Sequence, residues 1–246
     1  MGNVIIQSMT PQPRSQPSLL SRSFYLALGL WMVALVVVGF WPTYYGPLLS
    51  GTFDLKPIIE IHAVVFSGWI VLFVAQTFLV YTGRLKWHRK VGWFAVGYAT
   101  LMVGVVITAL AMRFSDHMAA GDIREAHRSL VISSVDLLLF SGFLTAAIAY
   151  RKKAQIHKRL IIVATVVLMG PAVGRMTFLS AVPLILFVLY SSPILFGMAF
   201  DFAIRRRVHA VYIIGLILHL VSLVRLPLQD SEAWFGFSKW VYGLFT

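Results

Sequence analysis

Ionisable side chains interrupt, or lie at the ends of, the long apolar runs of this 246-residue sequence. Asp136 interrupts the run 129–150, Arg175 interrupts the run 160–200, and His219 lies inside the run 208–224. A charged group within a bilayer is costly, so such a residue is a functional candidate by default. We therefore expect Asp136, His219 and Arg175 to be the catalytic or transport residues, if the protein has such an activity.

Depth along each helix separates these candidates. Asp136 follows His127 by nine residues, which at a rise of about 1.5 Å per residue places it roughly 13 Å into a helix, near the bilayer midplane. Its role is either that of a proton-relay or ligand group, or that of a protonated side chain bonded to a neighbouring helix. His219 reaches a similar depth and is either functional or a satisfied interhelical histidine. Arg175 stays charged, and its expected partner is Asp136 or a bound anion.

A polar stripe in the run 61–82 extends this pattern. His62, Trp69 and Gln76 recur every seven residues and so lie on one helix face. Together with Asp136, His219 and Arg175 they predict a polar cavity that opens outward. This arrangement favours a transporter or a metal-dependent membrane enzyme, for which His62 and His127 are also the candidate metal ligands.

Four histidines form a second pattern, because each stands at the start of an expected helix. His62 and His127 begin helices at one face of the membrane, and His88 and His157 begin helices at the other. One histidine pair near each face is the arrangement that two stacked haems with two axial imidazoles each require. The alternative is that a histidine followed by Arg or Lys only anchors a helix end at the interface.

In this layout, residues 58–180 resemble the transmembrane di-haem cytochrome b family that transfers electrons from ascorbate across membranes. The resemblance implies b-type haem held by His62 with His127 and by His88 with His157, and exchange of electrons with a quinol or a small reductant. The sequence departs from the family where His88 and His157 lie among lysines and arginines, and where His209 repeats the loop pattern without a ligand role.

The loops also resemble those of an uncharacterised group of bacterial multi-pass membrane proteins with paired His-Arg motifs. The matching residues are His62, Trp69, Gln76, Gly83-Arg84, His88-Arg89, Gly92 and His157-Lys158-Arg159. This second resemblance implies a bacterial membrane location and no particular activity.

Several classes of chemistry are excluded by what the sequence lacks. The chain has no cysteine, so disulfides, thiolate metal sites and cysteine nucleophiles are impossible. It has no glycine-rich phosphate loop, no His-Glu-x-x-His motif and no Gly-x-Ser-x-Gly motif. The formal charge of +12 comes from short loops between apolar runs, so we expect no nucleic-acid partner.

The elements that must position these residues are membrane helices. The chain is 59% hydrophobic and 12% charged, with a mean hydropathy of +0.83, which is typical of a membrane protein. A span needs about 20 apolar residues, and seven runs qualify: 24–40, 61–82, 91–112, 129–150, 160–179, 182–200 and 208–224. The expected fold class is therefore an all-α polytopic bundle of seven transmembrane helices.

Three regions follow from these spans. Residues 1–22 are rich in Pro, Ser and Gln and predict a disordered tail. Residues 23–226 form the bundle, with a turn near 180–183 between the fifth and sixth helices. Residues 227–246 are rich in aromatic residues and predict a segment that lies in the membrane interface.

Orientation and repeats follow from the loops. Fourteen of the 21 lysines and arginines fall in the tail and in the segments 83–90, 151–159 and 204–207. The positive-inside rule then places the N-terminus in the cytoplasm and the C-terminus outside a bacterial inner membrane. A basic segment with a histidine recurs in these three loops, which predicts three related helical hairpins plus an added first helix.

The sequence thus predicts, first, a membrane redox protein with b-type haem and a quinone partner in the bilayer. The alternatives are the transporter or metal-dependent enzyme described above, and a structural or assembly protein without a cofactor.

Overall fold

Every regular element in the part of the chain that the structure describes is helical. The computed structural model describes residues 18–52, 56–179 and 182–244. The helices are α1 (Leu19–Phe40), α2 (Gly46–Ser50), α3 (Pro57–Tyr81), α4 (Leu85–Ala119), α5 (Ile123–Ala149), α6 (Ala154–Val167), α7 (Gly170–Gly174), α8 (Pro183–Arg205), α9 (Ala210–Ser222), α10 (Arg225–Leu228) and α11 (Glu232–Tyr242). A π-helical turn, Trp41–Tyr45, joins α1 to α2, and a 3-10 turn, Thr177–Leu179, precedes α8.

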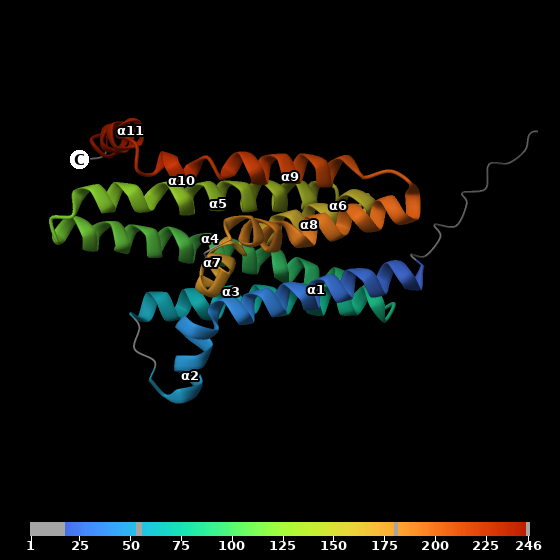
Figure 1. Cartoon of the computed structure of the whole chain (residues 1–246). Helices are drawn as coiled ribbons and strands as arrows, with labels where there is room; N and C mark the ends of the chain where they lie inside the picture. The colour runs from blue at the N-terminus through green and yellow to red at the C-terminus, as the bar shows by residue number, and fades with distance from the viewer. Residues whose placement is uncertain (1–17, 53–55, 180–181, 245–246) are drawn as a thin grey trace, which may run out of the picture.

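Seven helical segments in the described residues are long and apolar enough to cross a bilayer. They are α1 with α2, α3, α4, α5, α6 with α7, α8, and α9 with α10. Their long axes run roughly side by side, with α2 turned away from the bundle (Figure 1). The expected all-α class and the number of spanning helices are confirmed, and they indicate a multi-pass membrane protein.

The basic connections lie together at one end of the bundle. The links 82–84, 150–153 and 206–209 lie at the end where α1 begins, and α11 lies at the opposite end (Figure 1). A hydrogen bond from Arg205 to the side chain of Gln155 (2.7 Å) ties the second and third of these regions together. The strongly basic sequence segments therefore form one continuous end of the molecule.

Some helices begin earlier than expected from the apolar runs, because a cap or good helix-forming residues extend them. α1 begins at Leu19 because the Ser18 side chain accepts a hydrogen bond from the backbone of Ser21 (3.3 Å), so residues 19–22 belong to the bundle instead of the tail. The rest of the predicted tail, 1–17, lies outside the described residues. α4 begins at Leu85, because the basic residues expected in the loop are good helix formers.

The fifth span is interrupted, unlike the continuous helix expected over 160–179. α6 ends at Val167, and α7 begins at Gly170 with Pro171 in its first turn. Proline lacks a backbone N–H and disfavours a helical residue before it, which accounts for the break. The predicted turn at 180–183 includes residues 180 and 181, which lie outside the described part, and α8 begins at Pro183.

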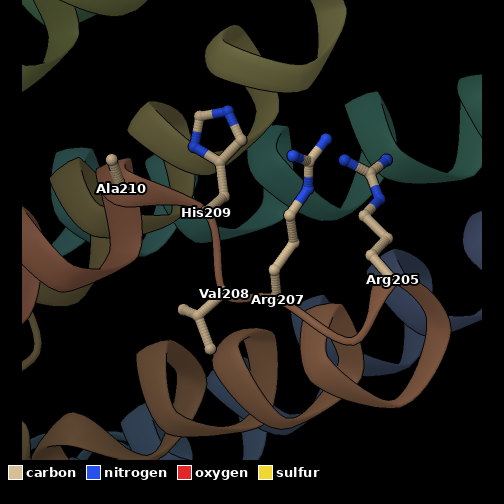
Figure 2. A pocket seen from close by; sticks show the side chains of 5 residues that line it. All are labelled: Arg205, Arg207, Val208, His209 and Ala210. Atoms are coloured by element: carbon tan, nitrogen blue, oxygen red, sulfur yellow. The ribbon is translucent and has the colours of Figure 1, made fainter.

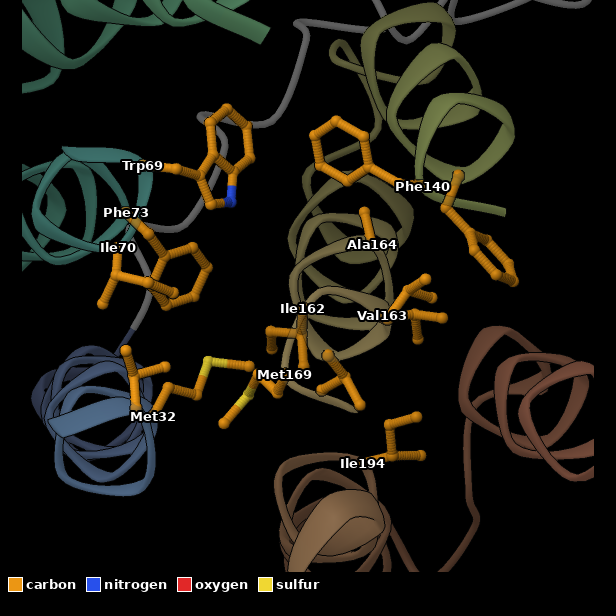
Figure 3. Packing of buried hydrophobic residues seen from close by; sticks show 14 of the residues in the cluster. Met32, Trp69, Ile70, Phe73, Phe140, Ile162, Val163, Ala164, Met169 and Ile194 are labelled. Carbon is orange, nitrogen blue, oxygen red and sulfur yellow. The ribbon is translucent and has the colours of Figure 1, made fainter. Parts of the chain in front are cut away.

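The core surrounds α6, the most buried of the spans. Ile162, Val163, Ala164 and Val166 are at most 1% exposed. Trp69 from α3, Phe140 from α5, Met32 from α1 and Ile194 from α8 surround them (Figure 3). A helix that is apolar on all sides is buried on all sides, whereas the outer helices expose side chains such as Val71 and Leu138 where lipid would lie.

The aromatic C-terminal segment forms α11, which packs against α5 across the end of the bundle (Figure 1). The Trp234 indole N–H donates to the backbone carbonyl of His127 (2.8 Å). This contact fixes α11 next to one of the candidate histidines.

Candidate functional site

The histidines His88 and His157 come together at the basic end of the bundle. His88 lies in the first turn of α4, and His157 lies in the first turn of α6. The two half-buried rings are close enough to interact electrostatically. α5 packs against both helices that carry these rings, α4 and α6. Two neighbouring imidazoles on separate helices thus lie at this end.

The backbone holds one ring nitrogen of this pair. The His157 Nδ1 lies 2.8 Å from the carbonyl oxygen of Ala147. In the neutral tautomer that carries its hydrogen on Nδ1, this nitrogen donates to the carbonyl. The His88 ring lies near the backbone of Gln76 in α3. A backbone carbonyl that holds one ring nitrogen orients the other nitrogen for a ligand, as in metal-ligating histidines.

Polar atoms without partners gather around the same place. The Nδ1 of His88 and both amide atoms of Gln76 are buried and have no hydrogen-bond partner in the described structure. Buried polar groups in native proteins are nearly always paired. Their number here fits a site that is completed by a bound group with polar substituents.

The second pair, His62 and His127, is packed differently. The His62 ring stacks on Phe66 of its own helix (ring centroids 4.2 Å apart) and lies near Arg175. The His127 ring is 1% exposed and meets the edges of Phe114, Phe235 and Tyr242. Each Nδ1 is buried without a partner, but no contact joins the two rings in the described structure. Both rings fit a ligand role singly, and the structure does not bring them together.

The side chains of Trp69 and Phe140 pack against each other in the interior of the bundle. Their rings meet edge to face with centroids 5.3 Å apart, and the Trp69 N–H points to the Thr165 hydroxyl (3.4 Å). Figure 3 shows the two aromatic rings next to each other, near Ala164 of α6. The stripe His62, Trp69 and Gln76 therefore faces the bundle interior, as its spacing indicates.

The described residues contain no group of three or more His, Asp or Glu side chains that could hold a metal ion. A bare metal ion usually takes four or more ligands. Haem iron takes four of its ligands from the porphyrin and only two from the protein. A haem would therefore need only two histidines from the chain, whereas a bare metal ion would need further ligands.

Asp136 has a partner that differs from the expected one. Its carboxylate lies 2.5 Å from a guanidinium nitrogen of Arg225, and the two side chains are 14% and 6% exposed. Arg175 instead lies over the Phe40 ring and donates to the carbonyl of Pro171 (2.8 Å). Of the two partners expected for Arg175, Asp136 is wrong, because Arg175 directly follows α7 and its side chain lies against Phe40 of α1.

The partner of Asp136 joins it to a buried polar cluster of four helices. Arg225 reaches the Tyr190 hydroxyl, and the Tyr190 ring meets the His219 ring with centroids 4.0 Å apart. His219 is 2% exposed, and its Nε2 has no partner in the described structure. The expected outward cavity is therefore divided: Asp136 and His219 lie in this cluster, whereas Arg175 and His62 lie together elsewhere.

Three buried residues, Arg159, Asp201 and Arg225, were not expected from the sequence. Arg159 and Asp201 are each 1% exposed and form a two-armed ion pair between α6 and α8. The sequence places Arg159 in a run of loop cations, so its burial has no local signal. For Arg225 and Asp201 a signal exists, because each is a lone charge at or near the end of an apolar run.

Comparison of the chain with protein-family models, with curated proteins and with solved structures finds no match. Both resemblances described above therefore stay predictions, and the functional argument rests on the chain's own residues.

Proposed function

We propose that this protein is a redox protein of the bacterial inner membrane that binds b-type haem and transfers electrons. The observation that carries the proposal is the pair His88 and His157, which lie near each other on α4 and α6, with the Nδ1 of His157 held by the carbonyl of Ala147 and the Nδ1 of His88 buried without a partner. Two such imidazoles are the protein ligands of a low-spin b-type haem. His62 and His127 are the proposed ligands of a second haem.

The bound haem would supply reversible one-electron transfer, and the chain's residues would set its environment. His88 and His157 would hold the iron, and Gln76, whose amide has no partner in the described structure, would be available to a polar substituent of the group. Apolar side chains on α3 to α6 exclude water from the interior, which raises the influence of each nearby charge. A quinol in the bilayer, or a small reductant, is the proposed electron donor.

The test is a reduced-minus-oxidised absorption spectrum of the full chain, purified after expression with sufficient haem. We expect the sharp α and β bands of bis-histidine haem. His88→Ala and His157→Ala should each remove the same spectral component, and His62→Ala or His127→Ala should remove another. His117→Ala is the matched control, because His117 faces Asp122 at the far end of α4 (3.7 Å).

A colourless protein with normal helical content would overturn this proposal. A coloured protein whose spectrum survives both His88→Ala and His157→Ala would overturn the ligand assignment. Bands that depend on His88 and His157 alone would support one haem and remove the second from the proposal.

The buried cluster around Asp136 favours a second candidate, a proton-coupled transporter. An ionisable pair at the middle of α5, next to a histidine with an unpaired nitrogen, is the arrangement of a proton relay. If the protein binds no haem, Asp136→Asn should abolish proton-coupled uptake in vesicles while the protein still folds. Wild-type vesicles without any proton flux would leave a structural or assembly role.

A further inference from the structure

The two ends of the bundle differ in how their charged side chains are paired. At the end that carries α11, cations pair with carboxylates of neighbouring elements. The pairs are Lys56 with Asp116 (2.6 Å), Arg113 with Glu125 (3.5 Å), Arg124 with Glu232 (2.6 Å) and Arg128 with Asp230 (2.6 Å). The charges of this end are thus balanced within the chain.

At the basic end, Asp201 is the only acidic residue within the described part of the chain. Its carboxylate is buried and already accepts hydrogen bonds from the Arg159 guanidinium, and one oxygen also lies 3.3 Å from the backbone nitrogen of His209. No carboxylate pairs with Lys152, Lys153, Arg205 or Arg207 among the described residues. Their positive charges are therefore available to an anion from outside the chain.

These cations line two adjoining hollows. One, of about 300 Å³, is lined by Arg205, Arg207, Val208, His209 and Ala210. The other, of about 500 Å³, is lined by Lys152, Lys153, Ala154, Gln155, Ile156 and His209. His209 belongs to both, and the side chains of Arg205, Arg207 and His209 extend to the same side of the α8–α9 connection (Figure 2). Basic groups from two connections therefore converge on one place.

Hydrogen bonds within the chain hold this arrangement in position. The Gln155 side-chain oxygen accepts from Arg205 (2.7 Å) and from the buried Arg159 (3.0 Å). The His209 ring accepts a hydrogen bond from the backbone of Val211 (3.2 Å) and so caps α9. Because Arg159 and Gln155 orient Arg205, the site is built before any ligand arrives.

The electrostatic surroundings of His209 agree with a site for an anion. Burial first, and then the positive charges of Arg159, Arg205 and Arg207, lower the pKa of His209, and Asp201 only partly opposes them. Neutral His209 then acts as a cap while the surrounding guanidinium groups supply the charge.

We propose that the two hollows bind a phosphate group, as found in an anionic phospholipid headgroup or in a soluble phosphate ester. Guanidinium and ammonium groups give the strong, charge-assisted hydrogen bonds that phosphate oxygens accept. Basic pockets between helices at a membrane surface bind such headgroups. This inference goes beyond the redox proposal and stands independently of it.

The test compares two double variants of the full chain that lose the same charge. Arg205→Gln with Arg207→Gln removes two cations that line the hollow, whereas Arg206→Gln with Lys86→Gln removes two basic residues that line neither hollow. Retention of phosphatidylglycerol against phosphatidylcholine is measured by native mass spectrometry. We expect about a tenfold weaker preference in the first variant, corresponding to loss of a hydrogen bond to a charged group, and less than a twofold change in the second.

Competition identifies the source of the phosphate. Displacement of phosphatidylglycerol by millimolar inorganic phosphate or glycerol 3-phosphate would assign the site to a soluble phosphate, and resistance would assign it to the lipid headgroup. Equal losses in both double variants would overturn the proposal, because a diffuse surface potential would then explain the preference. The proposal would also be overturned if the wild-type protein showed neither a preference for phosphatidylglycerol nor binding of inorganic phosphate.

Discussion

At the scale of single residues, the buried ion pair between Asp136 and Arg225 is the most consequential contact. Each partner is nearly inaccessible to water, so neither charge has a substitute partner in solvent. Removal of one member of a buried pair leaves an unpaired charge and is strongly destabilising. The pair also links α5 to α10, and so holds the end of the last span against the centre of the bundle.

We expect Asp136→Asn to lower the free energy of unfolding by about 3 kcal/mol, since it leaves Arg225 buried without a counter-charge. The double variant with Arg225→Gln should recover part of that loss, because both charges are then removed. Thermal melts in detergent measure both effects.

Arg175→Gln is the matched control for this prediction. It removes a guanidinium that faces no carboxylate in the described structure and interacts with the Phe40 ring, so we expect a change well below that of Asp136→Asn. Strictly additive losses for Asp136→Asn and Arg225→Gln would show that the two residues are not coupled.

At the scale of helices, close packing at glycines sets how α1 meets the interrupted fifth span. A Cβ placed on Gly39 would collide with the backbone carbonyl of Ala172 in α7. Small residues permit such approaches between membrane helices. The break between α6 and α7 is thereby supported from the side by α1.

Gly39→Ala should therefore destabilise the protein by about 1–3 kcal/mol, the usual cost of overpacking a well-packed contact. Gly104→Ala in α4 is the control, because nothing lies within 4 Å of the position that its Cβ would occupy. Alanine there should leave the stability unchanged or raise it by up to about 1 kcal/mol, owing to its better helix propensity. Melting temperatures of the two variants decide the matter, and equal effects would argue against a tight contact at Gly39.

At the scale of the whole molecule, the gathering of basic connections at one end predicts its orientation. The positive-inside rule places the connections 82–84, 150–153 and 206–209 in the cytoplasm and the α4–α5 connection outside. Because the chain contains no cysteine, a single introduced thiol reports on one place without background.

We expect Ala120→Cys to react with a membrane-impermeant thiol reagent in intact cells, and Lys152→Cys to react only after the membrane is opened. Both positions are exposed, so accessibility to the reagent should depend on the side of the membrane alone. The cysteine-free parent measures background labelling. Labelling of Lys152→Cys in intact cells would contradict the predicted orientation and place this connection outside.

The sequence by itself determined the class of the protein and the number of its spans. A bilayer requires about 20 apolar residues for each crossing helix, and this requirement acts on local stretches of sequence such as 61–82. It also indicated which residues are unusual, since Asp136, His219 and the histidines at helix starts are visible without knowledge of their neighbours. Helix ends were less predictable, because caps such as Ser18 and the break at Pro171 act through single residues.

Only the tertiary structure decided which of these residues meet. Arg225, at the end of the last span, pairs with Asp136, whereas the sequence offered Arg175 as its partner. His88 lies near His157, but His62 and His127 pack apart, although the members of both pairs lie near the starts of helices. The physical reason is that hydropathy specifies only how far each helix extends along its axis. Which side chains become partners depends on the rotation of each helix and on its packing around α6, and no local sequence pattern encodes these.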